Sequence, residues 1–217
     1  MRLPIAKRGG FELVTHGLRA EEASQEASRC LQCATVCDKC VQVCPNRANV
    51  PYEIAPLDVQ VPIVSLSDGA VVGHERVAIS QPRQILHVDD WCNECGNCTT
   101  FCVHEGKPYA EKPRLFWDRT AFDASGHSAL FVDGAVLHAK TSDGTSFRVV
   151  LSEDGYAYED ADLTARLTPT FAVAEVRPRR RGDGVRSLRA AVETAALFHA
   201  LRTSAPFILR DREEGAS

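Results

Sequence analysis

The stretch from Trp91 to Tyr109 reads WCNECGNCTTFCVHEGKPY and contains the run Cys92-x2-Cys95-x2-Cys98-x3-Cys102. This spacing is typical of a loop that binds a 4Fe–4S cluster. Two-residue gaps let one tight loop supply three thiolates to a single cluster, whereas the fourth cysteine of such a run binds another cluster. The run therefore predicts two clusters that exchange one ligand.

An earlier stretch, RCLQCATVCDKCVQVCPNRANV at residues 29–50, supplies the complementary ligands. Its part Cys37-x2-Cys40-x3-Cys44, followed by Pro45, repeats the end of the same run. We expect Cys44 to cross to the cluster held by the later run. Cys102 should cross in the opposite direction, to the cluster held by the earlier stretch.

The cluster of the earlier stretch has more candidate cysteines than the four ligands that it needs. The five candidates are Cys30, Cys33, Cys37, Cys40 and Cys102. One arrangement uses Cys33, Cys37 and Cys40 and leaves Cys30 spare, and the other uses Cys30, Cys33 and Cys40 and leaves Cys37 spare. The residues alone do not choose between them. The positions common to both arrangements are Cys33, Cys40, Cys44, Cys92, Cys95, Cys98 and Cys102.

The distribution of cysteines favours metal over disulfides. All nine cysteines lie between Cys30 and Cys102 of a chain of 217 residues, whereas a secreted disulfide scaffold would spread an even number over the whole fold. Structural zinc is the alternative, since C-x2-C pairs also bind zinc, and the chain would then be an assembly module. A continuous run of four cysteines fits a cluster loop better.

The composition describes an ordinary globular protein. Lys and Arg number 25 against 29 Asp and Glu, so the chain lacks the basic excess that a nucleic-acid backbone demands. Nowhere do about 18 consecutive apolar residues occur, so we expect no membrane partner and a cytoplasmic location. The histidines are scattered and the cysteines are committed to metal, so no catalytic residue is predicted.

The remaining pattern predicts an α+β fold. A short helix is expected over residues 18–31, a strand-bearing hairpin insertion between Leu57 and Val88, and a closing helix over residues 187–201. Three Asp-Gly pairs, ending at Gly134, Gly144 and Gly155, predict an antiparallel meander. We therefore expect a two-cluster, ferredoxin-like domain over 11–114. A small antiparallel β unit with a C-terminal helix should follow over 115–205.

The cysteine stretches resemble known iron–sulfur proteins. EEASQEASRCLQC is similar to the opening of the N-terminal 4Fe–4S domain of the glutamate synthase small subunit and of dihydropyrimidine dehydrogenase. The longer stretches at 29–50 and 91–109 resemble the C-terminal iron–sulfur region of the YgfK family of selenate reductase-like subunits. That likeness covers roughly residues 11–114. It departs from the family at Val103, where proline is usual, and in the 57–80 insertion.

The resemblance implies an electron-transfer subunit with two 4Fe–4S clusters. Its partners would be a flavoprotein subunit with FAD and NAD(P)H sites and a catalytic subunit, such as a molybdenum hydroxylase, of a hetero-oligomeric oxidoreductase. An adapter of a glutamate-synthase-like NAD(P)H oxidoreductase is a related alternative. The chain has no G-x-G-x-x-G run, so we expect it to bind neither flavin nor nicotinamide by itself.

Overall fold

The computed structural model describes residues 4–10, 17–28, 37–180 and 182–209. The chain divides into two units, Met1–Val36 and Cys37–Ser217. The first unit contains the 3-10 helix η1 (Ile5–Lys7) and helix α1 (Ala20–Ser28). α1 confirms the predicted N-terminal helix over its described part, and Glu21 and Glu22 lie in its first turn, where the helix dipole favours acidic residues.

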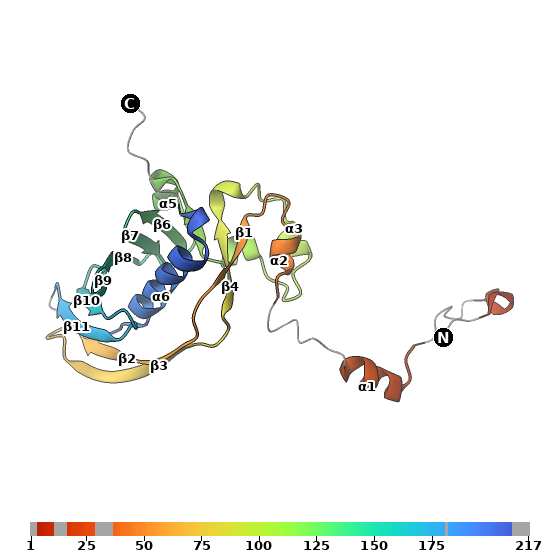
Figure 1. Ribbon diagram of the computed structural model, residues 1–217, viewed down its shortest axis with the longest axis horizontal. Coiled ribbons are helices and arrows are strands. Elements are labelled where there is room, and N and C mark those ends of the chain that lie inside the picture. The colour runs from red at the N-terminus through yellow and green to blue at the C-terminus, as the bar shows by residue number, and fades with distance from the viewer. Residues whose placement is uncertain (1–3, 11–16, 29–36, 181, 210–217) are drawn as a thin grey trace, which may run out of the picture. The chain divides into compact units, whose positions relative to one another are not determined.

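The second unit is built on a nine-stranded sheet (Figure 1). In spatial order its strands are β1 (Asn49–Glu53), β4 (Arg83–Val88), β5 (Arg114–Phe116), β6 (Ala129–Asp133), β7 (Val136–Lys140), β8 (Ser146–Ser152), β9 (Gly155–Glu159), β10 (Leu163–Leu167) and β11 (Val173–Pro178). β5 pairs in parallel with both β4 and β6. The other neighbours are antiparallel, and β6 to β11 form the predicted meander.

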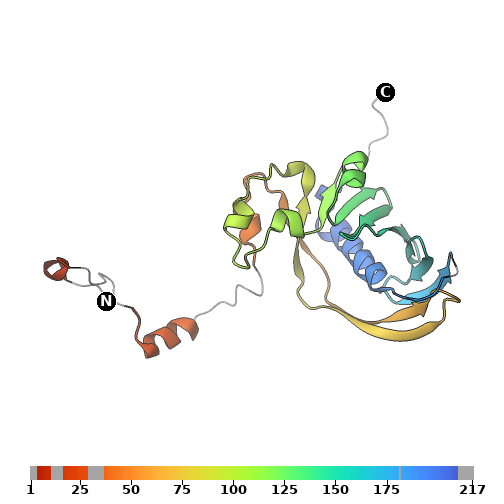
Figure 2. The same cartoon turned by 180° about the vertical axis from the view of Figure 1, so that it is seen from behind.

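A smaller sheet contains the predicted hairpin. Its strands lie in the order β12 (Val185–Ser187), β2 (Leu57–Ser65) and β3 (Val71–Ile79). β2 and β3 pair antiparallel from Leu57↔Ile79 to Val64↔Val71. Gly69 in their turn has φ +79°, a conformation that favours glycine. The long ribbon of β2 and β3 is prominent in Figure 2.

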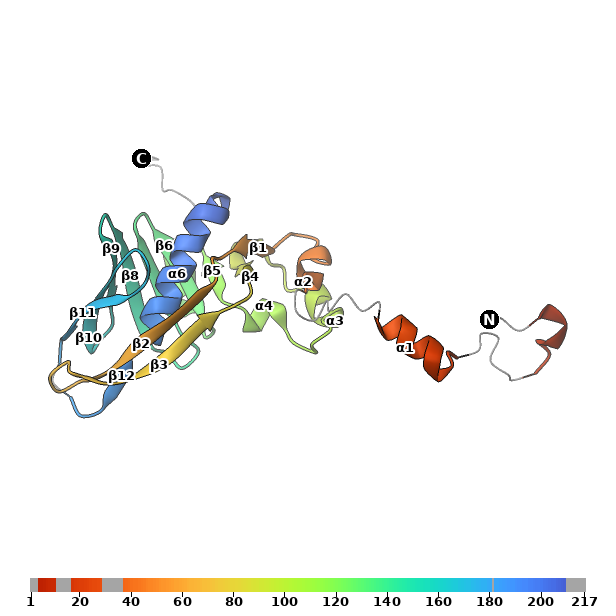
Figure 3. The ribbon, with the colours of Figure 1, turned by 60° about the horizontal axis from the view of Figure 1, so that its bottom comes forward.

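Helix α6 (Arg189–Ser204) supplies the centre of the core. Ala191, Val192, Ala195, Phe198 and Leu201 are fully buried and recur at helical spacing. They share one hydrophobic core with residues of both sheets. α6 therefore lies between the nine-stranded sheet and the β2–β3 ribbon, as Figure 3 shows. This confirms the predicted closing helix.

The cysteine-bearing loops gather beside β1 and β4 at one end of this unit (Figures 1 and 2). They contain only single turns of helix. These are α2 (Lys39–Gln42), η2 (Asp89–Trp91), α3 (Asn97–Thr100) and α4 (Pro108–Glu111). The short helices α5 (Arg119–Ala124) and η3 (Pro206–Ile208) lie outside the loops.

The expected small antiparallel β unit is wrong in size and partly wrong in type. The meander continues through β5 into β4 and β1, so the sheet has nine strands and a parallel part. β1 escaped sequence reading because Pro51 lies within it. As an edge strand, β1 can tolerate a proline. The division into domains at 114/115 stays a prediction, and the sheet pairs strands from both sides of that position.

Among the described residues, none of the helices combines the length and apolar character that crossing a membrane requires. Three arginines on β11 and in the segment between β11 and α6 pair with acidic side chains. Arg177 pairs with Glu175 at 2.5 Å, Arg179 pairs with Glu159, and Arg186 pairs with Asp162.

Candidate metal centre

Four cysteines from two distant stretches line one cavity. They are Cys44, which follows α2, and Cys92, Cys95 and Cys98 of the later run. This cavity, called the Cys44 cavity below, is narrow, about 10 Å³. Of its four cysteines, Cys95 is exposed, Cys44 and Cys92 are half-buried and Cys98 is buried.

A second cavity brings together the remaining described cysteines. Cys37 and Cys40 of the earlier stretch line it with Cys102, the last cysteine of the later run. Its volume is about 320 Å³. This cavity, called the Cys102 cavity below, contains cysteines from both stretches, as the Cys44 cavity does. Cys44 and Cys102 thus each lie beside cysteines of the other stretch.

Backbone amides donate hydrogen bonds to three of these sulfurs. Ala48 N lies 3.2 Å from Cys44 Sγ, and Gly106 N lies 3.3 Å from Cys102 Sγ. Each donor follows its cysteine by four residues, and the chain between them turns through a positive φ, at Arg47 in one case and Glu105 in the other. Cys44 and Cys102 therefore lie in two local turns of the same kind.

The third such bond lies inside the later run. Glu94 N donates to Cys92 Sγ at 3.3 Å. Glu94 has φ +52° and Gly96, the N-cap of α3, has φ +79°. Two left-handed residues coil the chain tightly between Cys92 and Cys98. Amide hydrogen bonds to sulfur favour the thiolate and are among the features that set the potential of an iron–sulfur cluster.

Positive charge lies close to the Cys44 cavity. Arg114 on β5 is only 9% exposed, and its Nε donates to Asp89 Oδ1 at 2.6 Å. The same guanidinium lies 3.6 Å from Glu94. Burial raises the pKa of the Cys92 thiol, and the hydrogen bond from the Glu94 amide and, to a smaller extent, the Arg114 charge oppose that rise. Burial likewise raises the pKa of the Cys40 thiol. A bound metal cation favours the ionised form of such thiols, because the thiolate is the form that binds metal.

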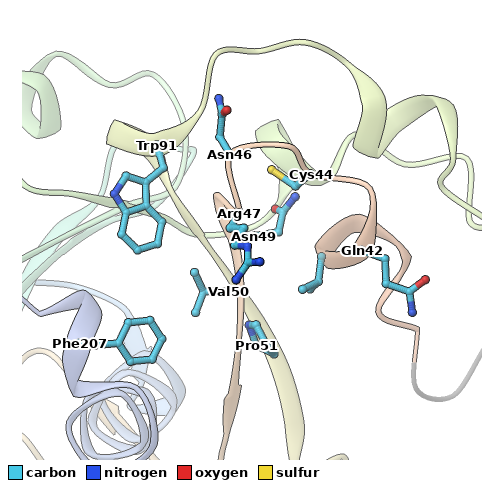
Figure 4. A pocket seen from close by; sticks show the side chains of 10 residues that line it. Gln42, Cys44, Asn46, Arg47, Asn49, Val50, Pro51, Trp91 and Phe207 are labelled. Carbon is cyan, nitrogen blue, oxygen red and sulfur yellow. The ribbon is translucent and has the colours of Figure 1, made fainter.

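A groove of about 800 Å³ borders Cys44 on its other side (Figure 4). Trp91 and Phe207 lie on one side of it, and Cys44 and Gln42 lie on the other. Phe207 is 66% exposed. The groove gives an outside molecule access to the surroundings of Cys44.

The donor set fits iron–sulfur clusters. All seven described cysteines are free of disulfides. Among the described residues, no three or more His, Cys, Asp or Glu side chains converge as a ligand set for a single ion. Thiolates supplied by two interleaved loops are the ligands that a 4Fe–4S cluster takes. The residues that could hold clusters are Cys37, Cys40, Cys44, Cys92, Cys95, Cys98 and Cys102.

Some predicted ligands fall outside this description, and some neighbours were missed. Cys30 and Cys33 lie outside the described residues, so their role stays a prediction. His104 is exposed and lines the Cys102 cavity. Sequence reasoning missed Asn49, His87 and Arg114, which are buried polar residues on β1, β4 and β5. Their only signal was a position shortly before or after a cysteine run.

Comparison with known proteins supports the same chemistry. Residues 7–65 match the family model described as dihydropyrimidine dehydrogenase domain II, 4Fe-4S cluster. This segment contains the five cysteines from Cys30 to Cys44. The chain carries a 4Fe–4S region of this type. Such a region supports a role in electron transfer.

A longer similarity links the chain to "Putative oxidoreductase YgfK" of Escherichia coli. The chain is 40% identical to this protein over 121 residues, which is 56% of the chain. The values are the same for the proteins of strain K12 and strain O157:H7. The chain covers 10% of the length of these relatives. No solved structure matches the chain. The YgfK-like resemblance that the cysteine stretches indicated is therefore confirmed.

Proposed function

We propose that the chain is an electron-transfer subunit that holds two 4Fe–4S clusters. The observation that carries this proposal is the sorting of seven cysteines into two cavities, each lined by cysteines from both stretches. The clusters, when bound, supply one-electron transfer. The protein's part is to fix their positions, to donate amide hydrogen bonds to the ligand sulfurs and to limit contact with water.

The cavities favour one of the two ligand arrangements. The Cys44 cavity would hold one cluster on Cys44, Cys92, Cys95 and Cys98. In the Cys102 cavity, Cys37 stands beside Cys40 and Cys102, which supports the arrangement that uses Cys37. Cys33 would then be the fourth ligand and Cys30 the spare cysteine.

The partners follow from the likeness to YgfK, which is named as an oxidoreductase. We propose that a flavoprotein subunit and a catalytic subunit of a larger oxidoreductase exchange electrons with this chain in the cytoplasm. The groove between Cys44, Trp91 and Phe207 is where a partner could come closest to the Cys44 cluster. The chain would hold no flavin or nicotinamide by itself.

Iron and acid-labile sulfide analysis of anaerobically purified protein tests the cluster count. Two clusters require about eight irons and eight sulfides per chain and paramagnetic signals on reduction. A colourless protein that contains zinc instead would refute the proposal and favour the assembly module. About four irons per chain would refute the two-cluster form of it.

Single substitutions test the exchange of ligands. Cys44→Ser should disturb the cluster of the later run, although Cys44 belongs to the earlier stretch, and Cys102→Ser should disturb the other cluster. Electron paramagnetic resonance of each variant identifies the cluster that is lost. Cys30→Ser is the matched control and should keep both clusters, whereas Cys37→Ser should not. If Cys44→Ser and Cys37→Ser disturb the same cluster, the exchange does not occur.

A further inference from the structure

Arg114 is a buried positive charge that the sheet places next to the later cysteine run. It belongs to β5, the short strand that pairs in parallel with both β4 and β6, and it is only 9% exposed. A buried guanidinium is costly unless acidic groups and hydrogen bonds compensate its charge. The two acidic residues that do so, Asp89 and Glu94, lie on either side of Cys92 in the sequence.

Asp89 connects the guanidinium to the chain that leads into Cys92. Arg114 Nε and Nη2 both donate to Asp89 Oδ1. Asp89 begins the single turn η2, and the Cys92 backbone amide donates to the Asp89 carbonyl oxygen at 2.8 Å. Because the donors of a guanidinium form a rigid fork, these bonds hold the turn before Cys92 in one position relative to β5.

Glu94 connects the same guanidinium to the chain that leaves Cys92. Its carboxylate oxygen Oε1 lies 3.6 Å from Arg114 Nη2, and Glu94 itself lines the Cys44 cavity. The Glu94 backbone amide donates to Cys92 Sγ at 3.3 Å, from a residue with φ +52°. One guanidinium therefore contacts the segments before and after Cys92, and it lies one side chain away from the cavity that we propose for a cluster.

From this geometry we infer that Arg114 is a positioning residue for Cys92 and that its charge raises the reduction potential of the cluster in the Cys44 cavity. The inference rests on the proposed function. An arginine side chain does not lose its proton in proteins, so its charge is permanent. Because reduction adds negative charge to a cluster, a buried positive charge nearby favours the reduced form. Without Arg114, that cluster would lie beside the carboxylates of Asp89 and Glu94 with no compensating cation from β5.

Two substitutions that break the same ion pair separate the effect of charge from that of structure. Midpoint potentials are measured on full-length, anaerobically purified protein by redox titration followed by electron paramagnetic resonance. Arg114→Gln removes a positive charge and should lower the potential of the cluster whose signal Cys44→Ser disturbs. Asp89→Asn removes a negative charge and should raise the same potential. Shifts in the same direction would show an effect of the broken pair alone and would overturn the inference, as would an unchanged potential in Arg114→Gln.

Arg114→Lys separates positioning from charge. The ammonium keeps the positive charge but cannot reproduce the fork, so we expect the potential to stay close to that of the natural protein while the amides of Cys92 and Glu94 exchange faster. If Arg114→Lys lowers the potential as much as Arg114→Gln, or leaves these amides unchanged, the inference is wrong. Because lysine still offers a cation to Asp89, this variant decides the question even if Arg114→Gln does not fold.

A matched control and the natural protein keep the two proposals apart. Arg148→Gln breaks a similar ion pair, with Glu159, between β8 and β9 outside the cysteine loops, and it should change neither potential. Natural protein with about eight irons per chain, together with Arg114 variants whose potentials are unchanged, would overturn the inference and leave the proposed function standing. Absence of iron and sulfide from the natural protein would overturn both.

Discussion

The cysteine loops and the sheet with α6 are stabilised in different ways. In the loops at 37–48 and 89–112, the buried side chains are Cys40, Ala48, Cys98 and Pro108. In the sheet and α6, a continuous core of Leu, Val, Phe, Tyr and Ala residues is almost fully buried. Apolar burial alone can hold the second region together, whereas the first has almost none. We therefore expect the order of the loops to depend on what their cysteines bind.

Of the changes considered, removing the metal should have the largest effect, and this effect should be confined to the cysteine loops. In small proteins whose fold depends on a bound metal, the binding free energy is on the order of 10 kcal/mol. We expect amide hydrogen exchange in the loops to become fast after chelation under anaerobic conditions, while β7 to β10 and α6 keep their protection. If the loops and the sheet with α6 lost amide protection equally, the expected difference between the two regions would be wrong.

A substitution in the hydrophobic core should instead destabilise the sheet region. Phe198 on α6 is 0% exposed, and Phe198→Ala is expected to lower the free energy of unfolding of the sheet region by about 3–5 kcal/mol. Denaturant unfolding followed by circular dichroism measures the loss. The control is Phe207→Ala, because Phe207 is 66% exposed and its removal should cost less than about 0.5 kcal/mol. Similar losses in the two variants would mean that α6 is not the centre of the core.

A glycine in the turn between β8 and β9 allows a test of the backbone conformation of the sheet. Gly155 has φ +130°, and a Cβ there would lie 2.1 Å from the Leu167 carbonyl oxygen on β10. Gly155→Ala should therefore destabilise the protein by about 1–3 kcal/mol or more, measured as a lower denaturant midpoint. Gly144→Ala is the matched control, since Gly144 also has a positive φ but a Cβ added there would meet no atom within 4 Å. A loss in Gly144→Ala as large as in Gly155→Ala would show that φ alone decides.

The same two regions differ in how far the sequence predicts them. Cys44 lies beside cysteines of the later run and Cys102 beside cysteines of the earlier stretch, as the spacing led us to expect, and the exchange of cluster ligands stays a prediction. The meander and α6 followed from Asp-Gly turns and helical periodicity. The pairing of β1 with β4, and of β4 with β5 and β6, could not be predicted, because β5 is three residues long and its pairing is set by tertiary contacts. His87 and Asn49 were missed for this reason, since only that pairing brings them together.

The ion pair between Arg83 and Asp38 joins the two regions and should show the smallest effect. Asp38 is the N-cap of α2 but makes no capping hydrogen bond, and its carboxylate instead accepts from Arg83 Nε on β4 at 2.8 Å. Both side chains are partly exposed, at 36% for Arg83 and 27% for Asp38, so the pair should contribute only about 0.2–1 kcal/mol.

Arg83→Gln should therefore raise the exchange rates of the α2 amides a few-fold and leave β7 to β10 unchanged, and high salt should reduce the difference between the variant and the natural protein. Arg76→Gln is the control, since Arg76 makes a similar pair with Asp58 on the β2–β3 hairpin, outside the cysteine loops. If Arg76→Gln affects α2 as much as Arg83→Gln does, the Arg83 pair does not hold the loop. If Arg83→Gln alone loosens α2 while the clusters stay bound, part of the loop order comes from the sheet and the dependence on metal is not complete.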